Sequence, residues 1–581
     1  MVPYASSAGL NRCRWREVSF PWSLRSRTAV NTLIIMDVCT VGPLSSIRAV
    51  SLILTLSYFP LASAQQGSPS ATSGGTDAAS HHASLPLGIR NVLDMLDGVP
   101  AELHSNALLL LVESNQKLDK STKIKFLLEA FEEAPRASNP VKMSRGTPQL
   151  DAGSDAAMKW FAYEQNLDRV SLASRSIIDM ATIDPDDARS LATRLRLPEM
   201  PAVGCAQALV YDPKPYYSAL AAVAHGWKAN SADSNLSIID LLAPAVGSLE
   251  THTQVPLAAG LISGAGLSTD DLEMLAGLFA GQLRRLREDE RGFSAEMDGG
   301  NPTKSVNRLY KLLETTDPGS GSGLLKEFRT YLVENYRMGG CGDLWLPPEV
   351  ASSGGGATNQ SARILPAAII QFNDTFRAAL DRAGLGQIRL EEIDRSVPAA
   401  SLQIHHYWSD PESASLLRAA QLLRFDKNEE KRSESSLAST EWQQQAITFL
   451  GNVDDWRADP SKSVEVFNEK SVLYQSPIDL APQSEIKWLA IEKFLSMIEN
   501  SGLEREDAPA WMFLASQVQE RAFSLGTNGA KEPASAKLTK RFVNSSSPSL
   551  RLVGALDALH IDPFSSGPLE KLGLGPNPTR D

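Results

Sequence analysis

Cysteine and histidine are scarce in this chain of 581 residues, which contains four cysteines and eight histidines. The most suggestive metal-binding pair, His405 and His406, is adjacent, and in an extended segment neighbouring side chains point to opposite faces, so the two chelate one ion poorly. H-E-x-x-H, G-x-G-x-x-G and P-loop motifs are absent. The sequence therefore predicts no metal ligands, no cofactor-binding residues and no catalytic residues.

Long apolar runs are missing as well. The apolar part of Ser46–Gln66 (SIRAVSLILTLSYFPLASAQQ) is short and is broken by Pro60, whereas a membrane-spanning helix needs about 20 residues. The motif Ala62-Ser63-Ala64 has the small-residue pattern of a secretory cleavage site. We therefore predict that residues 1–64 are a signal region, that the protein is exported to a periplasmic or extracellular space, and that no membrane span remains after cleavage.

The signal region is unusually long for its type. A start at Met36 would leave a signal of ordinary size, which leads to the hypothesis that residues 1–35 are not translated. The segment after the cleavage site, residues 65–85, has the composition of a polar spacer. It is predicted to be a disordered linker.

Positive charge is in deficit. The chain holds 56 Lys and Arg against 68 Asp and Glu; residues 1–64 contain six basic and two acidic residues, so their removal leaves 50 against 66 and a net formal charge of −16. A field of that sign repels phosphate groups, so nucleic acid and anionic lipid are not expected partners. It fits a protein of an extracytoplasmic space.

Helical periodicity dominates the remaining sequence. Apolar residues recur at helical spacing in Lys120–Ala134, Ser268–Asp289 and Ile486–Ile498. Helix starts are marked by an Asp that precedes a Pro, as at Asp184 and Asp410, because the carboxylate caps the first turn and Pro fits its first position. Strand patterns are sparse.

The predicted fold class is therefore all-α. Short turns between successive helices, as in Ile177–Leu195, imply antiparallel neighbours, and stacked pairs of this kind form an irregular array of helical hairpins that is solenoid-like or toroidal. Only three short segments favour extended backbone, which allows at most a minor β-hairpin: Ala208–Pro213, Gln387–Ile393 and Ser401–Trp408.

Glycine-rich and polar breaks divide the predicted array. One break is expected at residues 317–323 (DPGSGSG), and the glycine run within residues 347–362 gives the predicted domain boundary. The chain is therefore predicted to contain helical lobe 1 at 86–346, a Gly-rich linker at 347–362, helical lobe 2 at 363–561 and a flexible tail at 562–581.

A resemblance covers about the first third of the exported chain. The order of KIKFLLEAFEEA (Lys123–Ala134), DPDDARSLATRLRLP (Asp184–Pro198) and CAQALVYDPKPYY (Cys205–Tyr217) resembles that of a group of secreted, all-helical, uncharacterised proteins of soil acidobacteria. The resemblance implies export and a helical fold, and it implies no activity.

Removal of the signal region leaves two cysteines, Cys205 and Cys341. Each follows a glycine and lies just after a predicted helix end, in a compartment that permits disulfides. We expect a disulfide between them; the alternative is two unconnected buried cysteines. Asp343 and the glycine turn beside Cys341 argue against a reactive thiolate there.

Acidic residues and tryptophans supply the remaining functional candidates. Asp454 and Asp455 close a predicted helix, where a carboxylate pair is electrostatically disfavoured. Three tryptophans follow predicted breaks and are candidates for sugar stacking, Trp345, Trp408 and Trp456, whereas Trp488 and Trp511 fall on apolar helix faces and are expected in the core.

Two functions follow from these features. The first is an exported, non-catalytic helical scaffold that binds a protein or an envelope component. The second is a carbohydrate-active enzyme on a helical toroid that uses Asp454 and Asp455 near exposed tryptophans, which requires two carboxyl groups about 5–10 Å apart across one bond. No metal or cofactor is expected for either.

Overall fold

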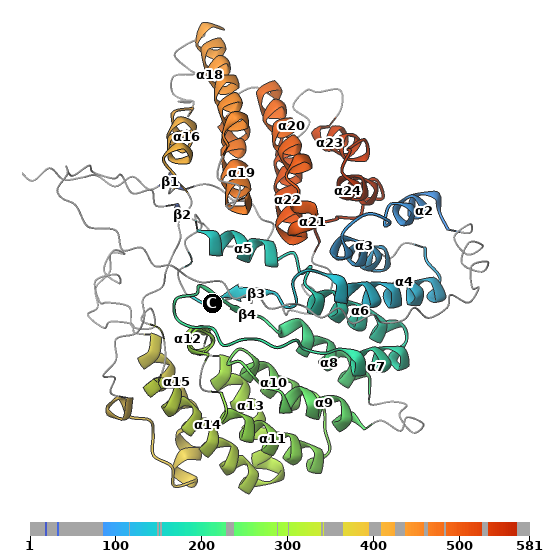
Figure 1. Ribbon diagram of the computed structural model, residues 1–581. Coiled ribbons are helices and arrows are strands. Elements are labelled where there is room, and N and C mark those ends of the chain that lie inside the picture. Colours follow the sequence, from blue (N-terminus) through green and yellow to red (C-terminus); the bar gives the residue numbers. More distant parts are fainter. Residues whose placement is uncertain are drawn as a thin grey trace, which may run out of the picture. The chain divides into compact units, whose positions relative to one another are not determined.

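The computed structural model describes residues 18–19, 32–33, 85–114, 117–147, 150, 154–227, 237–286, 289–299, 301–338, 341, 364–393, 408, 410–423, 436–457, 463–480, 484–525 and 533–565 (Figure 1). The chain divides into two compact units, Met1–Pro86 and Leu87–Asp581. In the first unit, β1 (Val18–Ser19) pairs antiparallel with β2 (Thr32–Leu33). Most of the predicted signal region and linker lies outside the described residues, so export remains a prediction.

The second unit is built almost entirely from helices, and this confirms the all-α fold class. Its first half consists of α2 (Leu87–Asp94), α3 (Ala101–Glu113), α4 (Lys120–Glu133), the 3-10 helix η1 (Ala134–Arg136), β3 (Met143–Arg145), α5 (Asp155–Tyr163), α6 (Arg169–Ile183), α7 (Pro185–Arg194), β4 (Leu209–Tyr211), α8 (Lys214–Gly226), α9 (Ile238–Gly247), α10 (Gln254–Gly264), α11 (Thr269–Leu283), α12 (Glu290–Gly299), α13 (Asn301–Thr316) and α14 (Pro318–Met338). Its second half consists of α15 (Ile364–Arg382), the 3-10 helix η5 (Leu390–Ile393), α16 (Pro411–Leu422), α18 (Ser436–Asp455), α19 (Ser463–Leu480), α20 (Ser484–Asn500), α21 (Leu503–Glu506), α22 (Ala508–Ser524), α23 (Ala534–Val543) and α24 (Pro548–Ala558).

Neighbouring helices pack in pairs along the chain. Helix α3 packs against α4, α6 against α7, α13 against α14, α19 against α20, and α23 against α24. Further contacts join the pairs to one another, including those of α4 with α6, α6 with α8 and α10 with α13. The apolar face of each helix is therefore covered by a partner, as an array of helical hairpins requires.

Helix starts follow the capping residues that the sequence predicts. Asp184 accepts a hydrogen bond from the Asp187 amide and precedes Pro185 at the start of α7, and Asp410 caps α16 in the same way before Pro411. Such a cap satisfies a backbone donor that the helix leaves open.

The predicted break at residues 317–323 is wrong, because α14 begins there. Asp317 accepts hydrogen bonds from the amides of Gly319 (3.0 Å) and Ser320 (2.9 Å), and Pro318 occupies the first helical position. This is a further Asp-Pro start, and its cap outweighs the cost of the glycines in the first two turns.

The extended segments have a mixed outcome. Ala208–Pro213 contains β4, which pairs antiparallel with β3 in the register Met143 to Tyr211 and Arg145 to Leu209. The two strands come from distant parts of the chain rather than from a local hairpin. Gln387–Ile393 is not a strand, because it ends in the 3-10 helix η5, and most of Ser401–Trp408 lies outside the described residues.

The two predicted lobes are in contact. Helix α22, from predicted lobe 2, packs against α5 and α3, and the rings of Phe513 and Phe161 stack with centroids 5.6 Å apart. Figure 1 shows α22 and α20 side by side above α5. The linker at 347–362 and nearly all of the tail at 562–581 lie outside the described residues, so this division of the chain remains a prediction.

Candidate functional site

A pocket of about 730 Å³ opens between α22, α23 and α24. Its volume falls within the range of about 300–1,000 Å³ that is usual for small-ligand sites. The pocket is lined by Phe523 of α22, by Ser535, Ala536, Thr539, Lys540, Val543 and Asn544 on and just after α23, and by Asp557, Ala558 and His560 at the end of α24.

The close approach of α23 and α24 depends on Gly554. A Cβ atom at this position would lie 2.7 Å from the backbone nitrogen of Val543 and 2.8 Å from the Cβ of Phe542. Backbone atoms cannot yield to such a contact, so any larger residue would push the two helices apart. The absence of a side chain at Gly554 therefore sets the distance between α23 and α24, which form two walls of the pocket.

Charged side chains fix both helices from outside the pocket. Arg541 of α23 forms a two-pronged ion pair with Glu499 of α20, with N–O distances of 3.0 and 2.6 Å, and its Nε lies 3.2 Å from Glu492. Glu504 of α21 accepts hydrogen bonds from the hydroxyl of Ser547 and the amide of Ser549 at the start of α24. Paired carboxylate–guanidinium contacts of this geometry hold elements in a defined orientation.

Two large apolar side chains of the lining remain open to solvent. Phe523 is 46% exposed and Val543 is 38% exposed. Each directly follows a buried residue, Ala522 and Phe542, and therefore lies beside the apolar stripe of its helix rather than on it. An apolar group at such a position is better covered than left in water.

The polar groups of the lining are partly satisfied. The Thr539 hydroxyl lies within hydrogen-bond distance of both Asp557 Oδ2 and the carbonyl of Ser535, which share its single hydrogen. Asn544 donates from Nδ2 to the carbonyl of Lys540 at 2.8 Å. Within the described part of the chain, Asp557 Oδ1 and Asn544 Oδ1 accept no hydrogen bond. The pocket thus presents acceptors beside its apolar faces.

Elsewhere, Cys205 and Cys341 form the predicted disulfide, with Cα atoms 5.1 Å apart and 136 positions between them in sequence. Arg291 lies fully buried beside it and donates to the carbonyls of Cys205 (2.5 Å) and Gly146 (3.3 Å). These bonds connect the start of α12 with the loop before β4 and the end of β3. The residues around the disulfide therefore hold these three segments together.

Asp289 organises the same region. Its buried carboxylate accepts hydrogen bonds from the amides of Val203 (3.1 Å), His252 (3.1 Å) and Gly292 (3.2 Å). Burial raises the pKa of Asp289, although the three hydrogen bonds oppose that shift. The His252 ring is buried and its Nδ1 lies 2.8 Å from the Tyr331 hydroxyl; burial lowers the pKa of His252 to about 3. His252 is therefore neutral at physiological pH and serves as a buried packing residue.

A second group of ionisable residues surrounds the β3–β4 ladder. Lys142 Nζ lies 3.3 Å from Asp212 Oδ2 and 3.0 Å from Asn166 Oδ1. Burial opposes the charge of Lys142, but Asp212 and other carboxylates nearby raise its pKa. Burial raises the pKa of Glu164, which Lys142 partly offsets. Shifted pKa values occur at functional sites and in structural ion networks alike, and these groups mainly satisfy one another.

Glu296 of α12 differs from its neighbours. Its Oε2 atom is buried and has no hydrogen-bond partner among the described residues. Burial, together with the charges of Asp212 and Asp289, raises the pKa of Glu296 to about 8. Its carboxyl group is therefore protonated at neutral pH. Among the described residues, no group of three or more His, Cys, Asp or Glu side chains is arranged to hold a metal ion.

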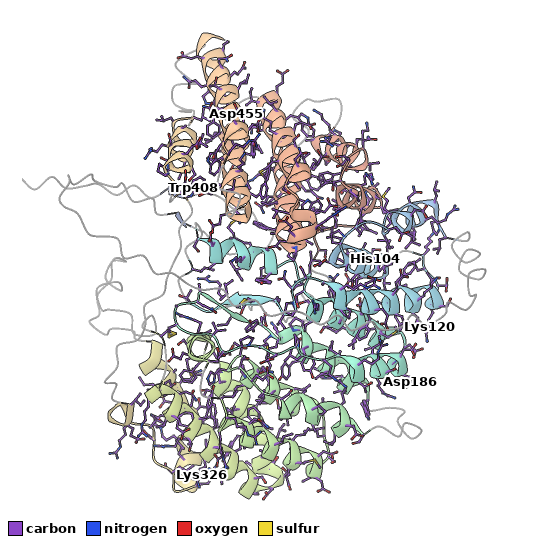
Figure 2. All side chains as sticks on the ribbon, in the orientation of Figure 1. His104, Lys120, Asp186, Lys326, Trp408 and Asp455 are labelled. Atoms are coloured by element: carbon purple, nitrogen blue, oxygen red, sulfur yellow. A yellow bond between two sulfur atoms is a disulfide. The ribbon has the colours of Figure 1, made fainter. Side chains whose placement is uncertain are left out.

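The predicted acidic pair does not form an open carboxylate site. Asp454 makes an ion pair with Lys493 and accepts a hydrogen bond from the Tyr474 hydroxyl. Asp455, at the end of α18, is exposed to solvent (Figure 2). Asp454 is therefore already engaged by two neighbouring side chains.

The tryptophans also depart in part from expectation. Trp456 is only 2% exposed, so it is a core residue rather than an exposed platform. Trp408 is half-buried with its amide bonded to Glu469 at 2.6 Å. Trp511 is fully buried, as expected, whereas Trp488 is half-buried, with the ammonium of Lys537 3.7 Å from its ring centroid. Trp345, His405 and His406 lie outside the described residues.

Comparison of this chain with protein-family models, with curated proteins and with solved structures gave no match in any of the three. Among the described residues, no helix combines the length and apolar character needed to cross a membrane. Function is therefore inferred from the site itself.

The sequence reasoning missed the pocket altogether. The signal that could have indicated it is the pair of large apolar residues, Phe523 and Val543, each one position beyond a buried residue at the end of its helix. Such residues are common singly, and only the structure shows that these two line one pocket.

Proposed function

We propose that the protein is an exported, non-catalytic binding protein that recognises a protein or an envelope component, and that its binding site is the pocket between α22, α23 and α24. The observation that carries this proposal is the pocket itself, where exposed Phe523 and Val543 lie beside acceptors that make no hydrogen bond within the described residues. Convergence of apolar faces with a few polar groups is typical of binding sites.

The construction of the pocket supports binding rather than catalysis. Its walls are fixed by the Gly554 contact and by the Arg541 ion pairs, so a ligand meets a preformed surface. Among the described lining residues Asp557 is the single carboxylate, whereas glycoside hydrolysis uses two. The engagement of Asp454 by Lys493 also leaves the alternative enzyme hypothesis without a favouring observation.

Affinity capture from the native cell envelope tests the proposal. The wild-type chain is compared with Ala558→Trp, which fills the pocket from an exposed lining position, and with Ala378→Trp, a matched change at an exposed position of α15. We expect the wild type and Ala378→Trp to retain the same envelope component and Ala558→Trp to lose it. Equal capture by all three proteins would overturn the assignment of the pocket.

A further inference from the structure

The lining of the pocket defines the chemical class of its ligand. Hydrogen-bonding side chains outnumber apolar ones: the former are Ser535, Thr539, Lys540, Asn544, Asp557 and His560, and the latter are Phe523, Ala536, Val543 and Ala558. Most of the surface that these residues expose to the pocket is nevertheless apolar. A matching ligand therefore needs a broad apolar face together with a few hydrogen-bonding groups.

The apolar face is supplied by Phe523. Phe523 is 46% exposed at the end of α22, and Val543, which also belongs to the lining, is 38% exposed at the end of α23. An aromatic ring that remains this open can cover a flat apolar surface of a ligand, such as the C–H face of a sugar ring.

The polar residues of the lining offer acceptors that a ligand with hydrogen-bond donors can satisfy. Asp557 Oδ2 accepts from Thr539, and Asn544 Nδ2 donates to the Lys540 carbonyl, whereas the Oδ1 atoms of both residues accept no hydrogen bond within the described residues. Hydroxyl groups both donate and accept, so several on one ligand satisfy such acceptors. A saturated acyl chain offers no donor and would leave these acceptors desolvated at a cost.

The balance of charge favours a neutral ligand. One lysine, Lys540, and one aspartate, Asp557, belong to the lining, so their formal charges cancel. An ionic ligand of either sign would be attracted by one of these residues and repelled by the other, so the lining offers no net attraction to a charged group. A neutral, polyhydroxylated ligand needs no such attraction.

We infer that the pocket binds the end of a neutral saccharide chain, with one sugar ring on Phe523 and its hydroxyl groups donating to Asp557 and Asn544. This inference rests on the proposed binding function and specifies the ligand of that same site. It requires no carboxylate pair and no bond cleavage, so it is separate from the enzyme hypothesis built on Asp454 and Asp455.

Calorimetric titration of the full exported chain tests the inference. The probes are neutral hexasaccharides of glucan, xylan and chitin, an anionic hexasaccharide of polygalacturonate, and laurate. We expect at least one neutral hexasaccharide to bind, and the anionic hexasaccharide and laurate to bind at least about tenfold more weakly.

Three variants of the lining and one control locate the binding. Phe523→Ala removes the ring and Asp557→Asn removes an acceptor charge, and each is expected to weaken binding of the neutral saccharide about tenfold. Met274→Ala, at an exposed apolar position of α11, is expected to leave binding unchanged. Because Asp557→Asn also alters the Thr539 contact, Asn544→Ala supplies a second test of the polar lining, read together with the melting temperature of each variant.

The outcomes separate the two proposals. If Ala558→Trp loses envelope capture but no neutral saccharide binds, or laurate binds best, the saccharide inference is wrong while the binding function stands. If a saccharide binds and neither Phe523→Ala nor the polar variants weaken it, the saccharide binds elsewhere and the inference is again overturned. If envelope capture does not depend on the pocket, the proposed function itself loses its site.

Discussion

Glu296 carries the clearest pH effect at the level of single residues. Its pKa is raised from 4.5 to about 8 in the folded protein, so between these values the folded state binds a proton that the unfolded state lacks. The free energy of unfolding contributed by this group is therefore fully present below pH 4.5 and falls as the pH rises toward 8.

We expect Glu296→Gln to remove this dependence. The amide resembles the protonated carboxyl group, so the variant should match the wild type near pH 5 and exceed its stability at pH 9, by a difference on the order of a few kcal/mol. Urea denaturation at both pH values measures it, with Glu441→Gln, at an exposed position of α18, as the control. A stability difference between wild type and Glu296→Gln that stays constant with pH would contradict the assignment.

Substitution of Arg291 is expected to destabilise the protein more than that of any other charged residue near the disulfide. Its guanidinium is fully buried and donates to the carbonyls of Cys205 and Gly146, so Arg291→Met leaves buried carbonyls without donors. The expected loss is about 3 kcal/mol of unfolding free energy. Arg285→Met, an exposed change on the same stretch of chain, should alter stability by less than about 0.5 kcal/mol. Similar values for both variants in urea denaturation would refute the structural role of Arg291.

At the level of elements, a change of glycine to alanine is expected to have opposite effects on stability at two positions. Gly554→Ala places a Cβ against the backbone of Val543 and should cost about 1–3 kcal/mol, because α24 must move away from α23. Gly277→Ala, inside α11, places its Cβ in open space and should stabilise the helix by about 0.5–1 kcal/mol.

Thermal unfolding of the two glycine variants measures both effects, and saccharide titration adds a second reading. Gly554→Ala should also weaken binding at the pocket because it shifts a pocket wall, whereas Gly277→Ala should not. A stabilised Gly554→Ala protein, or unchanged stability in both variants, would show that the helix contact is looser than the structure indicates.

The elements also show how far the sequence could predict this fold. Periodicity and the Asp-Pro caps at Asp184 and Asp410 located helices correctly, because both signals are local. The same cap at Asp317 does not stand out in the sequence, because the glycines after it have the composition of a loop. Strand β3 could not be predicted, because three residues gain their pairing only from β4, more than 60 positions away.

The candidate site was less predictable than the fold. Cys205 and Cys341 could be paired by elimination, since only two cysteines follow the signal region. The pocket could not be predicted from the sequence, because it depends on how α22, α23 and α24 pack and on the close contact at Gly554. Trp456 illustrates the same limit, since its position after a helix suggested exposure while tertiary packing buries it.

For the whole molecule, the disulfide links the loop before β4 to the end of α14 and closes a loop with its cysteines 136 positions apart. Such a closure restricts the unfolded chain, with an upper value of about 5 kcal/mol from loop entropy. Reduction, or the double change Cys205→Ser with Cys341→Ser, should therefore lower the melting temperature in calorimetry, and reductant should have no further effect on the double variant. Oxidation of this pair also fits an extracytoplasmic compartment, so thiol labelling tests the proposed export. Protein recovered from its native compartment should resist labelling until it is reduced. Full labelling without reductant would contradict the bridge in the native protein and remove this support for export.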